Sequence, residues 1–184
     1  MAIKIIDNCC SSEFLDYLKH VAVSAENWSL FYPPSCSIED KFWKLNIFRY
    51  GEKVHPFLAG LATALLIQIY EAGGRGLFIP EINFCGISIK DKHRPDNMHK
   101  DDAQKSDGRK LVKVLGIINS DWEEEWGGGF IHNETSNYIK PTSFCVFDPS
   151  ELHSSEEIIT DKKRFAIDFT VYRDQPLPNV SLRY

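Results

Sequence analysis

The sequence has few cysteines and no excess of positive charge. Its five cysteines are odd in number and show no Cys-x-x-Cys spacing, so neither a disulfide framework nor a structural zinc site is indicated. The formal net charge of −5 argues against nucleic acid as the main partner, because binding to phosphates needs a positive surface. The sequence therefore predicts a reduced, cytoplasmic chain without a nucleic-acid partner.

Long hydrophobic segments are also absent. The N-terminal residues MAIKIIDN contain no apolar stretch of the length that a secretory signal needs. The most apolar stretch, residues 57–70, includes Gln68. With fourteen residues, the stretch is too short for a membrane span. We expect a core helix there and no membrane partner. No repeat or low-complexity linker divides the chain, so a single domain over residues 1–184 is predicted.

Hydrophobic patterns predict helices in the first part of the chain and strands in the rest. A short strand is expected at 3–6, a helix at 11–25 capped by Ser11, and a helix at 56–72 ended by Gly73 and Gly74. Further strands are expected at 77–82, 84–89, 111–119, 130–133, 143–147 and 164–172. This order predicts an α+β fold: a jelly-roll (cupin-like, double-stranded β-helix) core at about 76–173, N-terminal helical support at about 1–75 and an extended tail at 174–184.

The motif His99-x-Asp101, followed by His153, has the composition of a metal site. Residues i and i+2 of a strand point to the same face about 7 Å apart, so His99 and Asp101 can share one metal ion. His153 comes 54 residues later, which is enough chain for several strands to bring it opposite them. Two histidines and one carboxylate bind non-haem Fe(II) on one face and leave coordination positions open. We predict these three residues as metal ligands.

Arg164 follows His153 by eleven residues and begins an alternating strand. One face of this strand is apolar and suits packing against helices, and the other suits a polar lumen. The guanidinium group matches a carboxylate in shape and charge. Together with the metal set, Arg164 indicates an oxygenase that uses 2-oxoglutarate, with Arg164 pairing the distal carboxylate. The apolar face holds Phe165, Ile167, Phe169 and Val171, and the polar face holds Arg164, Ala166, Asp168, Thr170 and Tyr172.

Four segments resemble the prolyl-4-hydroxylase-like Fe(II)/2-oxoglutarate oxygenases. They are IKIIDNCCSSEFLDYL, LVKVLGIINSDWEEEWGGGF, KPTSFCVFDPSELHSSEEI and RFAIDFTVY. The resemblance implies a dioxygenase with Fe(II) on His99, Asp101 and His153, 2-oxoglutarate on Arg164, O2 as oxidant and ascorbate as an auxiliary reductant. It also implies hydroxylation of an unactivated C–H bond with release of succinate and CO2.

The sequence departs from this resemblance in two places. Gly129 stands where many members carry Glu or an aliphatic residue, and strand 111–117 offers no hydroxyl to the cosubstrate. Lys113 on that strand is the next candidate for the cosubstrate anchor after Arg164. Asp168 is an inward acid that needs a partner, so we expect a salt bridge inside the lumen first and a substrate contact second.

The substrate is less constrained than the site. The resemblance, and the polar Pro-containing loop 90–98 before the metal motif, favour a peptide or protein side chain, prolyl among them. The same loop suits a plain surface connection equally well. A free amino acid or other small-molecule substrate is the alternative within enzymes, and a non-redox cupin-like binding module is the alternative outside them. The sequence does not specify the oligomeric state.

Other conspicuous residues receive structural interpretations. We expect residues 122–126 (WEEEW) to form an exposed charged turn rather than a lip over the substrate. Gly127–Gly129 should form a tight turn into the next strand, because no helix follows. His55, His93 and His132 are expected to be structural or exposed.

Overall fold

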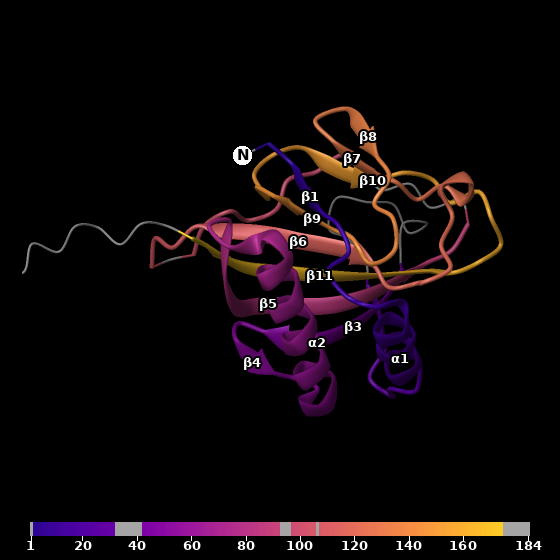
Figure 1. The fold of residues 1–184 in the computed structure, drawn as a ribbon, viewed down its shortest axis with the longest axis horizontal. Helices are drawn as coiled ribbons and strands as arrows, with labels where there is room; N and C mark the ends of the chain where they lie inside the picture. Colours follow the sequence, from indigo (N-terminus) through magenta and orange to yellow (C-terminus); the bar gives the residue numbers. More distant parts are fainter. Residues whose placement is uncertain (1, 32–41, 93–96, 106, 175–184) are drawn as a thin grey trace, which may run out of the picture.

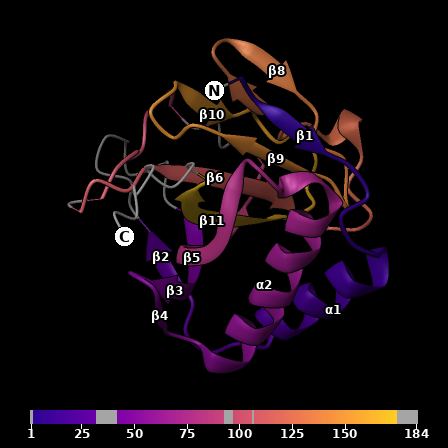
Figure 2. The same cartoon turned by 60° about the vertical axis from the view of Figure 1, so that its left-hand side comes forward.

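The computed structural model describes residues 2–31, 42–92, 97–105 and 107–174 (Figure 1). The described chain forms two β-sheets and two α-helices, arranged in layers. Helices α1 (Ser12–Val23) and α2 (Pro56–Ile69) cover one face of the larger sheet, and the smaller sheet lies over its other face (Figures 1 and 2). The space between the two sheets is therefore the one available for a lumen.

The strands pair in antiparallel fashion throughout. Within the described residues, the large sheet runs β1-β9-β6-β11-β5-β3-β2, with β4 paired to β3, and the small sheet runs β10-β7-β8. This is the jelly-roll, double-stranded β-helix architecture that the sequence predicts. The strands are β1 (Lys4–Ile6), β2 (Ser29–Phe31), β3 (Phe42–Arg49), β4 (Glu52–Lys53), β5 (Phe78–Lys90), β6 (Leu111–Ile117), β7 (Phe130–His132), β8 (Thr135–Asn137), β9 (Phe144–Phe147), β10 (His153–Ser155) and β11 (Arg164–Arg173).

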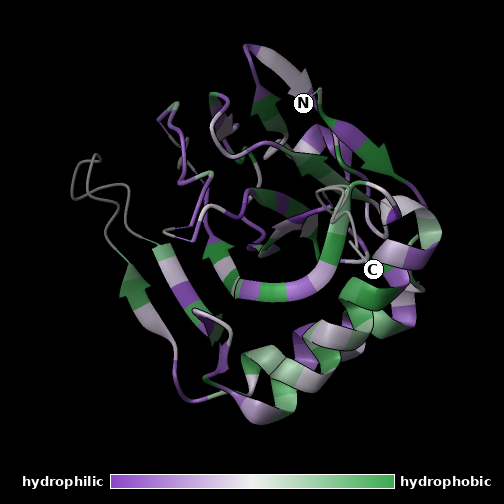
Figure 3. Ribbon diagram, turned by 90° about the vertical axis from the view of Figure 1, so that its left-hand side faces the viewer, coloured by the Kyte–Doolittle hydropathy of each residue, from purple (hydrophilic) through white to green (hydrophobic). Residues whose placement is uncertain are grey.

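The main hydrophobic core lies between the large sheet and the two helices. The predicted apolar face of β11 packs there, with Ile167, Phe169 and Val171 fully buried. Leu58 and Leu65 of α2 belong to the same cluster. Figure 3 shows the helices lying along this side of the sheet, and hydrophobic residues predominate in α2. The opposite face of β11 is thereby left for the lumen.

Both helices begin at a side-chain cap. The Ser11 hydroxyl accepts a hydrogen bond from the Phe14 amide at 3.2 Å, as predicted. His55 caps α2 through Nδ1, which accepts from the Leu58 amide at 3.4 Å, so this histidine is structural. A π turn, η2 (Tyr70–Gly74), ends the second helix at the predicted glycines.

Helix and π turn together give the apolar run Pro56–Gly74 the length and composition of a membrane span. The buried core helices of other proteins can have the same length and composition. Six residues of α2 are buried within the protein, so α2 is the core helix that the sequence predicts.

The interpretation of the first 75 residues as helical support is incomplete. Strand β3 forms inside this region and joins the large sheet between β2 and β5, although no strand is predicted there. A register shift between Asn46 and Phe48 breaks the period of two, so Ile47 and Phe48 are both buried. The predicted strands 77–82 and 84–89 are one strand, and β8 and β10 are unpredicted because each is short and contains no apolar residue.

The segment 122–126 is an exposed turn only in part. Its glutamates are exposed, but Trp122 is buried against Ile117 and Ile158, and its indole donates to the Gly127 carbonyl at 3.0 Å. Gly127 and Gly128 have φ of 74° and 73°, which favours glycine, and they turn the chain into β7 as predicted.

Several predictions concern residues outside the described part of the chain. The tail from 175 on, residues 93–96 of the loop before the metal motif, His93 and Cys36 all lie there. The four described cysteines are free thiols.

Candidate metal and cosubstrate site

A cavity of about 810 Å³ lies between the two sheets. Its wall includes every residue that the sequence analysis assigns to a metal or cosubstrate site. Strands of both sheets contribute to it, so residues far apart in the chain meet across the lumen. The predicted residues on its wall are His99, Asp101, Lys113, His153, Arg164 and Asp168.

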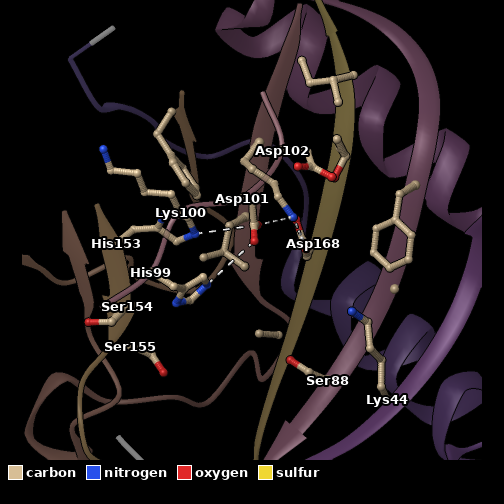
Figure 4. A pocket seen from close by; sticks show the side chains of 18 of the residues that line it. Lys44, Ser88, His99, Lys100, Asp101, Asp102, His153, Ser154, Ser155 and Asp168 are labelled. Carbon is tan, nitrogen blue, oxygen red and sulfur yellow. Dashed lines mark hydrogen bonds and ion pairs between the residues drawn. The ribbon is translucent and has the colours of Figure 1, made fainter. Parts of the chain in front are cut away.

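The structure brings His99, Asp101 and His153 together (Figure 4). One ligand atom from each lies within 4.8 Å of the other two. Nε2 of His99 is 3.9 Å from Oδ1 of Asp101, and Nε2 of His153 is 3.7 Å from Oδ2. The imidazole rings are 4.4 Å apart between centroids. Three donors at these separations can contact one ion between them.

Backbone pairing, rather than a regular strand, sets this arrangement. His99 and His153 form an isolated antiparallel bridge in which each amide donates to the other's carbonyl at 3.0 Å. The Asp101 amide donates to the Pro149 carbonyl at 2.8 Å. The expectation that His99 and Asp101 share a strand is therefore wrong in detail. A single bridge to β10 places the motif, while the chain on either side stays irregular.

The hydrogen bonds of both rings fit metal binding. Nδ1 of His99 lies 2.8 Å from the Asn97 carbonyl, and Nδ1 of His153 lies 2.9 Å from the Glu151 carbonyl. A carbonyl only accepts, so each Nδ1 carries a proton, and in the neutral ring the lone pair of Nε2 is left free to bind a metal ion beside Asp101. Metal-bound imidazoles are commonly oriented in this way. Two neutral imidazoles and a carboxylate suit a divalent transition metal with open coordination positions.

Lys113 on β6 links the carboxylates of the lumen. Its ammonium lies 3.0 Å from Oδ2 of Asp101 and 2.7 Å from Oδ2 of Asp168. Burial alone lowers the pKa of Lys113, but these two carboxylates outweigh it and hold the pKa above its ordinary value. Burial would raise the pKa of Asp101, but His153, when its ring is protonated, and the Lys113 ammonium hold it well below its usual range. The salt bridge predicted for Asp168 is present, with Lys113 as partner.

Arg164 lies at one end of the lumen and is buried. Its Nη1 donates to the Gly128 carbonyl at 2.6 Å, so the glycine turn positions the guanidinium group. Across the sheet, Arg164 pairs with Lys90 of β5, whose ammonium donates to the Ser155 hydroxyl at 3.0 Å. This end of the lumen therefore holds two buried cations.

Sequence reasoning missed two cations of the lumen, Lys90 and Lys44. The alternation of β5 extends by one residue to Lys90, and this pattern could have indicated an inward side chain. Lys90 also begins a polar run, however, and such a run suggests a loop. Lys44 lies on β3, where no strand is predicted. Both line the same cavity as the metal-ligand candidates.

Comparison with known proteins links the chain to one group of solved structures. No family model matches it, and no curated protein matches it. An oxidoreductase of the 2OG-Fe(II) oxygenase family from Burkholderia pseudomallei is similar, with a TM-score of 0.68 at 13% identity over 94% of this chain and 86% of that chain. A prolyl hydroxylase from Trichoplax adhaerens, in complex with a hypoxia inducible factor peptide fragment, is similar with a TM-score of 0.61. The identity is 17% over 94% of this chain and 83% of that chain.

The non-heme alpha ketoglutarate dependent carbocyclase SnoK from nogalamycin biosynthesis is also similar, with a TM-score of 0.64 at 13% identity over 94% of this chain and 79% of that chain. At these identities the likeness concerns the fold. The chain has the double-stranded β-helix fold of the 2OG-Fe(II) oxygenases and prolyl hydroxylases.

Proposed function

We propose that the protein is an Fe(II)- and 2-oxoglutarate-dependent dioxygenase that hydroxylates an unactivated C–H bond and releases succinate and CO2. The observation that carries this proposal is the convergence of two imidazole Nε2 atoms and the Asp101 carboxylate in a lumen that also holds the buried Arg164. A binding module without redox chemistry needs neither the open metal face nor the buried guanidinium group.

The residues of the site have separate roles in the proposed reaction. His99, Asp101 and His153 hold the iron, which supplies the activation of O2 when bound. Arg164 pairs the distal carboxylate of 2-oxoglutarate and so orients its other end towards the three ligands. Phe147 and Phe130 pack on the His153 ring, with centroids 4.9 and 6.0 Å away, and they fix the ring and keep water from that side.

The first test measures succinate formation by purified protein with Fe(II), 2-oxoglutarate and O2. We expect slow turnover without substrate, because the open metal face permits uncoupled reaction. Asp101→Ala and His153→Ala should each abolish it, since one of three ligands is lost. The control His20→Ala, on the exposed side of α1, should retain it. Full activity in either ligand variant, with the fold verified by circular dichroism, contradicts the proposed metal site.

For the substrate, we propose a peptide or protein side chain, prolyl among them. The resemblance of the sequence to prolyl hydroxylases and the peptide-bound Trichoplax neighbour support this choice. A small molecule is the second candidate, favoured by the charged groups inside the lumen and by SnoK, whose described role lies in nogalamycin biosynthesis. Incubation with proline-containing peptide libraries, followed by mass spectrometry for one added oxygen, tests the first. Oxygen gained by a free amino acid alone favours the second.

A further inference from the structure

Lys44 lines the lumen but does not belong to the cluster of three metal-ligand candidates. Lys44 belongs to β3, and β5 lies between β3 and β11. Its backbone is therefore about 10 Å from that of β11. It pairs with Ser88 of β5, and both line the cavity. Figure 4 shows Lys44 entering the pocket from the side opposite His99 and His153.

The buried cations of the lumen have polar partners. Lys113 lies between two carboxylates, Lys90 donates to Ser155, and Arg164 donates to Gly128. Within the described residues, no hydrogen bond or ion pair is found for the Lys44 ammonium. It lies instead over two aromatic rings, 4.8 Å from the centroid of Phe31 and 4.7 Å from that of Phe84. Two such contacts orient an ammonium group but leave its hydrogen-bond donors unused.

The sheet beneath Lys44 is shaped to let its side chain pass. Gly86 faces the lumen between Lys44 and Asp168, and a Cβ at this position would lie 3.4 Å from Cε of Lys44. The lysine stem therefore runs against a residue without a side chain, and the ammonium lies in the space between Phe31 and Phe84. Burial lowers the pKa of Lys44, and the Asp168 charge offsets part of this effect. A charge held in this way favours an anionic ligand.

We propose that Lys44 binds a carboxylate of the substrate, so that this site acts on a carboxylate-bearing molecule. The inference rests on the proposed function, because it assumes that the lumen beside the three metal ligands is where the substrate binds. The rings of Phe31 and Phe84 line the approach to the ammonium and suit the apolar part of such a molecule. A free amino or organic acid and an acidic side chain of a peptide present the same group to Lys44.

Ligand-observed NMR on the full-length protein tests this inference without turnover. The protein is loaded with Zn(II) in place of iron and with 2-oxoglutarate. One arm compares each proteinogenic L-amino acid with its C-terminal amide. The other compares short capped peptides containing Asp or Glu with the same peptides containing Asn or Gln. We expect the carboxylate form of at least one pair to bind about 10–100 times more tightly, the range of a charge-assisted hydrogen bond. The arm in which this occurs identifies the source of the carboxylate.

Variants assign the effect to Lys44. Lys44→Met should remove the preference for the carboxylate form, and Lys44→Arg should restore part of it. Lys53→Met, on the exposed strand β4, should keep it. Equal binding of acid and amide in every pair, or a preference that survives Lys44→Met, overturns the inference. If Lys44→Met does not fold, Lys44→Gln, which keeps a polar side chain without the charge, takes its place and should remove the same preference. Succinate formation that persists in any of these cases leaves the proposed function standing.

Discussion

The ammonium of Lys113 lies 3.0 Å from the carboxylate of Asp101, the only acid among the three candidate metal ligands. The same ammonium also binds Asp168, so one cation connects the metal site to the strand that carries Arg164. A divalent metal ion must share Asp101 with this ammonium or displace it. Lys113 therefore lowers the affinity for the metal while it holds the two carboxylates in place.

The first prediction concerns this competition. Lys113→Met should strengthen Zn(II) binding about tenfold, because a nearby positive charge repels the ion by at least about 1 kcal/mol. The same change should lower the free energy of unfolding by about 1–3 kcal/mol, because Asp168 loses its partner. Competition with a chromogenic chelator and urea denaturation measure the two effects. Lys110→Met, an exposed neighbour, should change neither. Weaker Zn(II) binding in the folded Lys113 variant would show that the ammonium mainly positions Asp101.

The second prediction links the metal to stability. Zn(II) at a hundred times its dissociation constant should stabilise the protein by about 2.7 kcal/mol, because it binds the folded site and not the unfolded chain. Thermal melting with and without Zn(II) measures this shift. The shift should disappear in Asp101→Ala and persist in Asp102→Ala, whose exposed carboxylate lies outside the three-residue cluster. An equal shift in both variants would place the Zn(II) elsewhere.

The residues of the candidate site could be predicted better than the backbone that carries them. The spacing of His99, Asp101 and His153 depends on residue types that few other sites combine, so it is visible in the sequence. Their placement depends on one isolated bridge between His99 and His153, which leaves no repeating pattern in either segment. The strand geometry assumed for the motif therefore differs from the structure although the same residues meet.

The cations of the lumen show where a periodic pattern fails. Arg164 lies on a ten-residue strand in which residues 164–172 alternate cleanly, so its inward direction could be predicted. Lys44 lies on β3, where the register shift near Asn46 hides the alternation. Lys90 is the last residue of β5, and the polar residues after it suggest a loop. Local irregularity, rather than low burial, conceals these two residues.

The third prediction concerns the cosubstrate. Arg164→Met should weaken 2-oxoglutarate binding by about two to three orders of magnitude, because a buried ion pair loses one partner at a cost of about 3–5 kcal/mol. Zn(II) binding should stay nearly unchanged. Calorimetric titration of the Zn(II)-loaded protein with 2-oxoglutarate measures the effect, and Arg109→Met, an exposed arginine, is the matched control. Unchanged affinity for 2-oxoglutarate would move the anchor to another cation of the lumen, with Lys113 and Lys90 the next to test.

The last prediction uses the glycine beneath Lys44. A Cβ at Gly86 would lie 3.2 Å from the Leu45 carbonyl and from the Phe84 ring, besides its contact with the Lys44 stem. The Leu45 carbonyl belongs to the backbone of the neighbouring strand and cannot easily shift. The side chains of Phe84 and Lys44 must therefore move away from the added methyl group. Gly86→Ala should therefore cost about 1–3 kcal/mol of stability, as overpacking commonly does, and should reduce the preference for carboxylate ligands.

Gly60→Ala is the matched control for that change. Gly60 lies inside α2 with nothing within 4 Å of an added Cβ, so alanine should stabilise the helix by about 0.5–1 kcal/mol and leave ligand binding unchanged. Urea denaturation and the NMR comparison of acids with amides measure both variants. If Gly86→Ala loses stability but keeps its preference for carboxylates, Gly86 matters for packing and does not determine the position of the Lys44 ammonium. A reduced preference, with Zn(II) binding intact, would show that this glycine keeps the path of the lysine open.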